Sequence, residues 1–182
     1  MGGGGLGVLI SRILIACAVA LAGAGPARAD QFWAGLYRHD VRPFGQEKFE
    51  GGEDIKVGWI GGPLTGLRAI GSPSPHVILS GNLSGGTDYA AAGVDWTFGR
   101  TLYVRPGIGM AVNDGPRRAY RKDRRVDLGS PITFEPELAF GWRVAPRVAI
   151  EASWIHLSHA MLFSRQNRGL DSWGVRTLIR LP

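Results

Sequence analysis

Hydrophobic and polar residues alternate along most of the chain with a period of two. The segment 132–143 is the clearest case, because one face carries Ile132, Phe134, Pro136, Leu138, Phe140 and Trp142. The other face carries Thr133, Glu135, Glu137, Ala139, Gly141 and Arg143. Successive side chains of a β-strand point to opposite faces, so this period is that of a strand. No segment after residue 30 has a sustained helical period, and the pattern therefore predicts an all-β protein.

About eight strands can be placed on this basis. They span roughly 31–41, 53–62, 76–83, 88–98, 101–112, 132–143, 147–158 and 171–181. The third is the weakest, and the Pro/Gly-rich segment 61–75 before it is hard to place. The links at 99–100 and 144–146 are short, whereas 113–131 is long. Short turns on the side of the termini and long loops on the other are typical of antiparallel membrane barrels. The link between the second and third strands is longer than this scheme prefers.

The alternation alone does not decide which face is the core. A soluble sandwich or lipocalin-like barrel would bury the apolar face, whereas a membrane barrel turns that face outward and keeps the polar face within. The polar faces carry full charges in the middle of strands, namely Arg105, Glu135, Glu137, Glu151, Arg176 and Arg180. Opposite charges can pair inside a narrow barrel. The charges therefore favour an eight-stranded antiparallel transmembrane β-barrel.

Aromatic residues give a second reason to prefer a membrane barrel. Six predicted strands carry one tryptophan each: Trp33, Trp59, Trp96, Trp142, Trp154 and Trp173. Amphipathic rings at strand ends would form the aromatic girdles of such barrels. The alternative is that they are ordinary core tryptophans.

The N-terminal segment 1–29 reads as a cleaved secretory signal. Arg12 precedes a short apolar run, and the segment ends in "ARA" before Asp30. A lipoprotein signal ending at Cys17 is less favoured, because only four residues separate Arg12 from this cysteine. We expect residues 30–182 to form one domain, without disulfides because Cys17 leaves with the signal.

The chain is mildly basic, with 21 Lys and Arg against 15 Asp and Glu. The basic residues are mostly dispersed and the chain is predicted to be exported, so a nucleic-acid partner is not expected. An anionic lipid surface fits this charge better. No metal-binding or phosphate-binding motif is present in the sequence, and we expect no cofactor.

Candidate chemistry lies in the last two predicted strands. His156 and Ser158 share one strand face, and Asp171 is in phase with Trp173 and Val175 on the next strand. All three side chains would point to the apolar, outer side of a membrane barrel. Ser158 could then be a nucleophile, His156 its general base and Asp171 the group that orients the imidazole. The alternative is a strand end that becomes polar where it leaves the membrane.

The motifs "HLSHA" and "NRGLDSWGVR", preceded by "GSPITFEPELAFGWR", resemble the lipid A 3-O-deacylases (PagL-type) and the related acyloxyacyl hydrolases of outer membranes. This resemblance implies an eight-stranded barrel with a Ser-His-acid triad that faces the membrane. It maps the triad onto Ser158, His156 and Asp171. It further implies that Asn167 and Gly169 support the site. His159 could assist as well, although a simple rim residue is the plainer interpretation. The acid is a glutamate in the best-studied members, and their serine is followed by an asparagine rather than a histidine.

The predicted outer loop carries a basic run that could contact lipid A phosphates, although a solvated loop is the simpler interpretation. Its residues are Arg117, Arg118, Arg121, Lys122, Arg124 and Arg125. His39 and His76 lack metal-ligand companions at useful spacing, so both are interpreted as structural.

The favoured hypothesis is a serine esterase in the outer membrane of a Gram-negative bacterium. Its substrate would be lipid A in lipopolysaccharide, its surroundings outer-membrane lipids, and a homodimer is possible. Two alternatives remain open, a non-catalytic small barrel with a structural or lipid-binding role, and a soluble periplasmic lipid-binding barrel.

Overall fold

The computed structural model describes residues 30–42, 48–117, 125–162, 165 and 167–182. Within these ranges, nine strands and one 3-10 helix follow one another. The strands are β1 Gln31–Arg38, β2 Glu53–Ile60, β3 Ser74–Asn82, β4 Tyr89–Asp95, β5 Phe98–Gly99, β6 Leu102–Asn113, β7 Ile132–Ala145, β8 Val148–Leu157 and β9 Leu170–Arg180. The Pro/Gly-rich segment 61–75, which the alternation does not assign to a strand, contains the helix η2, Thr65–Ile70. No helix in these ranges is both long and apolar enough to cross a membrane.

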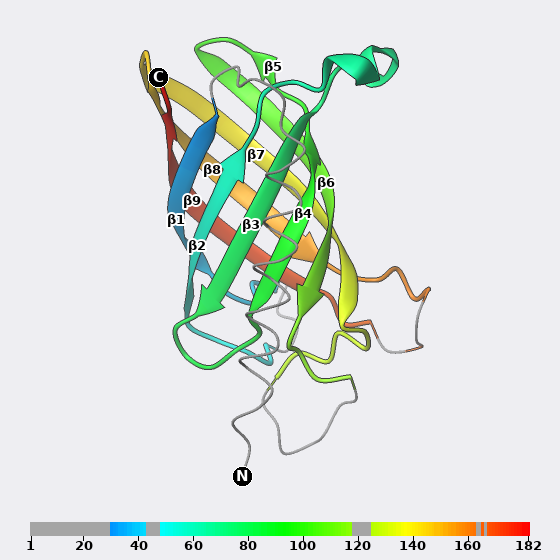
Figure 1. Cartoon of the computed structure of the whole chain (residues 1–182). Coiled ribbons are helices and arrows are strands. Elements are labelled where there is room, and N and C mark those ends of the chain that lie inside the picture. Colours follow the sequence, from blue (N-terminus) through cyan, green and yellow to red (C-terminus); the bar gives the residue numbers. More distant parts are fainter. Residues whose placement is uncertain (1–29, 43–47, 118–124, 163–164, 166) are drawn as a thin grey trace.

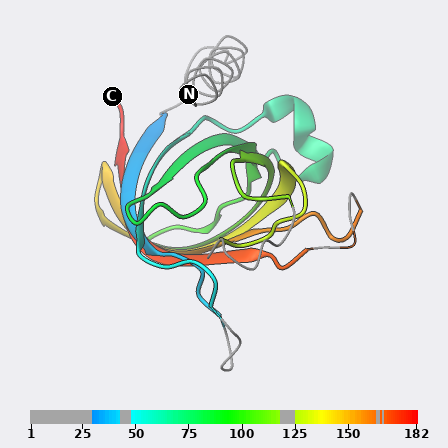
Figure 2. The ribbon, with the colours of Figure 1, turned by 90° about the horizontal axis from the view of Figure 1, so that it is seen from below.

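The strands close into a barrel. Neighbours pair antiparallel in the order β4-β3-β2-β1-β9-β8-β7-β6, and a further pairing of β4 with β6 closes the ring (Figures 1 and 2). Short β5 pairs only with the start of β6, so the closed wall has eight strands. This confirms the predicted fold class. Closure leaves no long unpaired strand edge, which a membrane-spanning sheet cannot tolerate.

The two faces of the wall are divided as the alternation predicts. Outward side chains such as Leu36, Phe140 and Val175 are each more than half exposed. Inward side chains include Lys56, Glu135 and Glu151, all fully buried. An apolar outer surface around a charged interior is the inverse of a soluble core and is the arrangement of a transmembrane barrel. The structure therefore agrees with the membrane interpretation and not with a soluble sandwich.

The tryptophans do not form the complete girdle that the sequence suggested. Trp142 and Trp173 are 55% and 53% exposed, but Trp33 and Trp59 are only 4% and 6% exposed. Trp33 occupies the inward phase of β1, where the guanidinium of Arg176 lies 4.4 Å from its ring centre. Inside the barrel, the indole of Trp33 therefore covers the buried guanidinium of Arg176. The girdle prediction is wrong for Trp33 and Trp59.

The first strand is also shorter than predicted. It was expected to reach residue 41 but ends at Arg38. Asp40 has a φ of 49°, in the left-handed region, and the amide of Val41 donates to the carbonyl of Asp171 on β9 at 2.9 Å. The chain therefore leaves the ladder with β2 after Arg38 and turns toward the start of β9.

The two ends of the barrel differ. One end carries the C-terminus, β5, η2 and the tight turn between β7 and β8, and is here called the turn end (Figure 1). The other end carries the connections β1–β2, β3–β4, β6–β7 and β8–β9, and is called the loop end. Val126 and Leu128 of the β6–β7 connection are fully buried there. Loop residues therefore contribute to the core at the loop end.

Candidate active site

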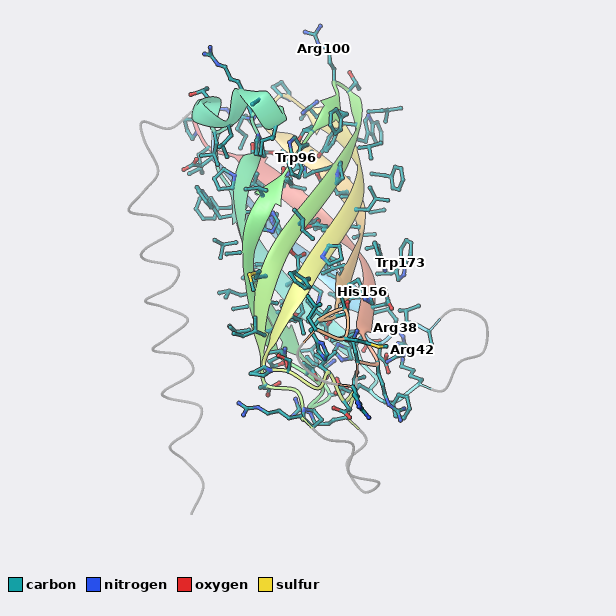
Figure 3. The ribbon with its side chains drawn as sticks, turned by 90° about the vertical axis from the view of Figure 1, so that its right-hand side faces the viewer. Arg38, Arg42, Trp96, Arg100, His156 and Trp173 are labelled. Atoms are coloured by element: carbon teal, nitrogen blue, oxygen red, sulfur yellow. The ribbon has the colours of Figure 1, made fainter. Side chains whose placement is uncertain are left out.

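His156 and Asp171 face each other across the β8–β9 ladder. The two residues are direct partners in its register, and His156 Nδ1 lies 3.0 Å from Asp171 Oδ1. The side chains keep 26% and 19% of their surface exposed, whereas the charged groups of the interior are buried almost completely. His156 lies in the half of the barrel toward the loop end, on the same side as Trp173 (Figure 3). A polar pair thus sits on the outer, apolar side of the wall, where an unpaired polar group would be costly.

Trp154 holds the carboxylate from a second direction. Its indole Nε1–H donates to Asp171 Oδ1 at 2.7 Å, the oxygen that also faces His156. The indole and the imidazole are stacked, with 5.9 Å between ring centres and 25° between planes. Trp154 precedes His156 by two residues and therefore shares its strand face. Two donors on one oxygen fix the position of the carboxylate relative to the imidazole.

Ser158 lies just beyond the end of β8. Its amide donates to the carbonyl of Phe134 and its carbonyl accepts from the amide of Phe134, at 3.2 and 2.7 Å. The serine side chain is partly exposed. In the described ranges, no hydrogen bond joins its hydroxyl to His156. The structure therefore brings His156 and Asp171 together and places Ser158 directly after the strand of His156, without a hydrogen bond between the two side chains.

The free side of the imidazole faces Gly169. Because Nδ1 is engaged by Asp171, Nε2 is the nitrogen that can accept a proton from a hydroxyl. A β-carbon built on Gly169 would lie 2.7 Å from His156 Cε1 and 3.3 Å from Nε2. Gly169 also has a φ of 67°, which disfavours other residues. Both observations explain why a glycine is needed next to the ring.

Arg42 supports the backbone on which Gly169 lies. Its guanidinium donates to the carbonyls of Arg168 and Gly169 at 2.9 and 3.0 Å, and its Nε donates to Asp40 at 2.6 Å. The fully buried Asp40 also accepts from two amides of the β1–β2 connection. The site therefore rests on a segment more than a hundred residues away in the chain. No pattern in the sequence indicates the role of Arg42, and Trp154 could have been suspected only from its shared face with His156.

The predicted supporting residues occupy different surroundings. Asn167 Oδ1 accepts from the amide of His159 at 3.2 Å, so Asn167 ties the β8–β9 connection to the residue after the serine. His159 is fully buried. The next two residues, Ala160 and Met161, both have positive φ within a turn closed by the amide of Leu162 and the carbonyl of His159. The chain after Ser158 is therefore held in an uncommon backbone conformation.

Only Arg117 and Arg125 of the basic run lie within the described residues. Arg118, Arg121, Lys122 and Arg124 lie outside the described residues. Arg117 is exposed, whereas Arg125 donates to Asp114 at 2.7 Å and to the carbonyl of Gly86. The guanidinium of Arg125 is therefore already hydrogen-bonded within the protein.

His39 anchors the β1–β2 connection near Asp40. Its two ring nitrogens lie 2.7 Å from Asp54 and 2.6 Å from Glu50. Burial lowers the pKa of His39, but the hydrogen bonds and charges of these carboxylates outweigh it and raise the pKa to about 9. Burial raises the pKa of Glu50, but hydrogen bonds from His39, Thr87 and Val126 bring it below its usual value. In the described part of the chain, no cluster of ligands suited to a metal ion is present.

A closed barrel with an apolar exterior and a His–carboxylate pair on that exterior defines an integral membrane barrel whose polar site faces lipid. The family model of the lipid A 3-O-deacylases (PagL) matches residues 65–180. The chain belongs to this family. No curated protein sequence matches it.

Solved structures show the same fold. The crystal structure of the outer membrane enzyme PagL matches with a TM-score of 0.58 and 17% identity, covering 83% of this chain and 99% of that one. De novo designed transmembrane β-barrels match with a TM-score of 0.52 and 10% identity, covering 87% and 99%. Neisserial surface protein A matches with a TM-score of 0.52 and 10% identity, covering 84% and 96%. At these identities the likeness concerns the fold.

Proposed function

We propose that this protein is a serine esterase of the Gram-negative outer membrane that removes an ester-linked acyl chain, at the 3-O position, from lipid A. The observation that carries the proposal is the His156–Asp171 pair on the lipid-facing side of the barrel, within a chain of the lipid A 3-O-deacylase family. A membrane-embedded ester reaches such a site laterally from the leaflet, and water reaches it from the rim. No cofactor is needed for this chemistry.

Ser158 is the proposed nucleophile. His156 Nε2 takes the hydroxyl proton as Ser158 Oγ attacks the acyl carbonyl, and the resulting imidazolium returns that proton to the departing sugar oxygen. This step leaves an acyl-serine and a lipid A with one free hydroxyl. A water molecule, deprotonated by the same nitrogen, then releases the fatty acid and regenerates Ser158. Asp171 holds the tautomer in which Nδ1 carries the proton and stabilises the imidazolium.

The proposal requires Ser158 and His156 to approach one another when substrate binds. Ser158 lies past the last ladder pair of β8, at the point where the positive-φ turn after it begins. Catalytic hydrogen bonds are often long without substrate and shorten in the complex. The bound acyl chain would favour this approach. Arg42 and Asn167 would assist by holding the backbone at Gly169 and His159 in place.

Two further parts of the proposal concern the loop end and export. Arg117, which is exposed, and the neighbouring basic residues of the same connection would bind the phosphates of lipid A. Residues 1–29 would be a signal peptide removed on export, which leaves residues 30–182 as the mature barrel.

Lipid A mass spectrometry tests the proposal. Outer membranes of a Gram-negative host that expresses this protein should contain lipid A lighter by one hydroxyacyl chain. Ser158→Ala should restore the original mass while the barrel still folds, which the shift in gel mobility between heated and unheated samples reports. Lipid A of unchanged mass in the presence of the folded wild-type protein would refute the proposal and favour a non-catalytic barrel.

A further inference from the structure

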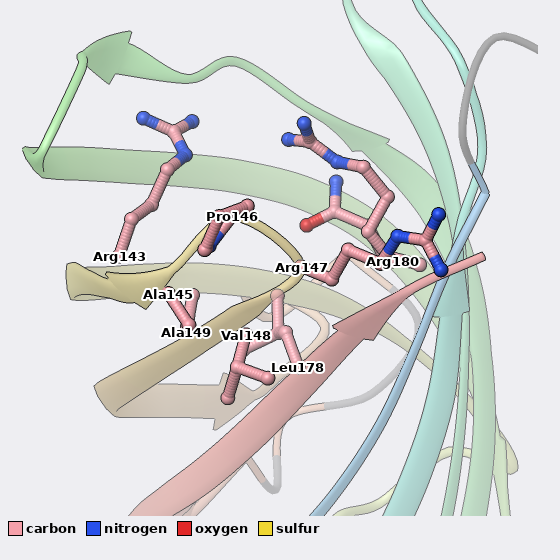
Figure 4. A pocket seen from close by; sticks show the side chains of 9 residues that line it. Arg143, Ala145, Pro146, Arg147, Val148, Ala149, Leu178 and Arg180 are labelled. Atoms are coloured by element: carbon pink, nitrogen blue, oxygen red, sulfur yellow. The ribbon is translucent and has the colours of Figure 1, made fainter. Parts of the chain in front are cut away.

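In the described chain, the longest connection at the turn end joins β2 to β3. Pro146 and Arg147 alone link β7 to β8 at this end, as Figure 4 shows, whereas residues 61–73 lie between β2 and β3. Short turns are usual on the periplasmic side of membrane barrels, which is the side of the turn end here. The extra length of 61–73 is therefore not needed to close the barrel.

This connection begins as an extension of the β2–β3 hairpin. Beyond the last ladder pair, the amide of Gly61 donates to the carbonyl of Pro75 at 2.8 Å. The amide of Leu64 donates to the carbonyl of Pro73, also at 2.8 Å. The helix η2 is therefore the tip of a hydrogen-bonded hairpin.

Trp96, directly after β4, braces this tip against the barrel. Its indole Nε1–H donates to the carbonyl of Ile70 at 2.7 Å. Gly71 ends η2 with a φ of 89°, and a β-carbon built on it would lie 3.3 Å from Cδ1 of the indole. The brace holds η2 outside the ring of strands, at the turn end (Figures 1 and 2).

The aliphatic side chains of η2 and its N-terminal cap do not join the core. No residue of η2 is buried, and Leu64, Leu67 and Ile70 are 37%, 42% and 57% exposed. They recur every three residues, which is the period of a 3-10 helix, although η2 is kinked at Leu67. A group of exposed aliphatic residues on a braced, projecting element indicates a contact surface for lipid or protein.

The outer wall of the barrel is apolar up to the end from which η2 projects. Outward residues near the strand limits at the turn end are 40% to 71% exposed, namely Phe98, Leu102, Val144 and Leu181. The lipid-facing surface of the wall therefore reaches the level of η2 (Figure 1). The aliphatic residues of η2 continue this surface sideways from the barrel.

The charge of the segment also suits a lipid interface. Arg68 is the only charged residue between positions 61 and 75, and its side chain is exposed. Segments that lie in the interface carry basic residues beside aliphatic ones, because long cationic side chains reach the lipid phosphates.

We propose that η2 is an interfacial anchor, which inserts Leu64, Leu67 and Ile70 into the periplasmic leaflet beside the barrel. Continuity with the lipid-facing wall favours the leaflet over a second copy of the chain as the partner. Insertion would fix the depth of the turn end in the membrane. The anchor is at the opposite end from Ser158 and does not depend on the deacylase activity.

Depth measurements with single nitroxide labels test the anchor. Cys17 is the only cysteine of the chain, so Cys17→Ser gives a background for labelling. The full chain is expressed, and the barrel is reconstituted into palmitoyl-oleoyl phosphatidylcholine vesicles. Collision rates with oxygen and with a nickel chelate should place labels at Leu67→Cys and Ile70→Cys about 5–10 Å below the phosphates. Phe140→Cys on the outer wall and Ser84→Cys in the β3–β4 connection are the lipid and water references.

A pair of double variants tests whether the aliphatic groups hold η2 in the leaflet. With the label at Leu64→Cys, Leu67→Ser with Ile70→Ser should move the label to the depth of the water reference. Thr65→Ser with Ala69→Ser changes the same helix without removing a large aliphatic group and should leave the depth unchanged. Heated and unheated gel mobility verifies that every variant is folded.

Three results would overturn the proposal. Labels on η2 that are as accessible to the nickel chelate as the label at Ser84→Cys would place the helix in water. Labels shielded from both reagents, with spin–spin broadening that disappears on dilution with unlabelled barrel, would show that a second copy covers η2. Equal depths at position 64 in the two double variants would show that the aliphatic groups do not hold the helix.

Discussion

The neighbouring strands β8 and β9 carry two cross-strand acid–base pairs in different surroundings. Glu151 pairs with Arg176 inside the barrel, and His156 pairs with Asp171 five residues further along β8 on the outside. The inner pair is 0–1% exposed, and Arg176 also binds Glu137 at 2.5 Å and covers Trp33. The outer pair is partly exposed and leaves His156 Nε2 facing Gly169.

The difference separates an enclosed pair from a pair whose imidazole remains accessible. Every side of the inner pair is occupied by another charge or ring, so its charges are fixed and cannot exchange protons with a substrate. Within the described residues, the side-chain hydrogen bonds of the outer pair all end on Asp171, where Trp154 adds a second donor. We therefore expect substitutions of the inner pair to change stability and substitutions of the outer pair to change activity.

Replacing His156 should give the largest effect. His156→Ala removes the proposed base, and we expect lipid A deacylation to fall by roughly 10³-fold or more, as for other triad histidines. The free energy of unfolding should change little, because the imidazole is partly exposed. Rates on purified lipid A, measured beside denaturant unfolding of the same sample, separate the two. A large loss of stability with a small loss of rate would assign His156 to the fold.

Replacing Arg176 should give the opposite result. Arg176→Ala leaves Glu137 buried without its cation, and breaking a buried pair from one side costs about 3–5 kcal/mol. Guanidinium unfolding of the barrel in micelles measures this loss. Arg38→Ala is the matched control, since its ion pair with Glu53 is exposed and is expected to contribute under 1 kcal/mol. Equal effects of the two substitutions would contradict a structural role for the inner network.

The buried His39 makes the loop end sensitive to pH. Its pKa of about 9 exceeds its ordinary value of 6.5, so its stabilising effect is complete below the ordinary value and is lost as pH rises through about 9. The lowered pKa of Glu50 acts in the other direction, with stabilisation lost as pH falls below its ordinary 4.5. Thermal unfolding should therefore show highest stability between roughly pH 5 and 7 and a decline of order 3 kcal/mol toward pH 10. His39→Gln should flatten the alkaline decline.

Trp154 should contribute the smallest of these effects, and it acts through Asp171. Trp154→Phe keeps an aromatic ring but removes the donor to the carboxylate. We expect kcat to fall about tenfold with KM unchanged, the loss of one charge-assisted hydrogen bond. Trp173→Phe is the matched control on the facing strand. In an Asp171→Asn background, Trp154→Phe should have no further effect on kcat. An equal loss in both backgrounds would contradict the positioning role.

Much of the fold could be predicted from the sequence because period-two alternation directly reflects the two faces of a strand. Mid-strand charges such as Glu135 and Arg105 then identified the polar face as the interior. The first strand was harder, since Phe32, Trp33, Leu36 and Tyr37 place large apolar groups on both faces. Trp33 fits inside because its ladder partner is Gly58, whose missing side chain makes room for the indole. That complementarity depends on a partner strand and is not visible along one strand.

The candidate site was predictable only in part, for a similar reason. Phase along β8 and β9 placed His156 and Asp171 on one side, and the register brings them into contact. The role of Arg42 and the position of Gly169 beside the imidazole depend on contacts between segments far apart in sequence. Alternation along one strand carries no information about such contacts. The position of Ser158 depends on how the chain leaves the last ladder pair, which is a property of the turn after it.

The central claim is that Ser158 is a nucleophile activated by His156 on the lipid side of the barrel. Labelling the folded protein in micelles with a fluorophosphonate, followed by peptide mass mapping, tests it most directly. The label should lie on Ser158 in the wild-type protein and disappear in His156→Ala, while Trp173→Phe retains it. A label on another serine, or labelling of Ser158 that does not depend on His156, would contradict the claim.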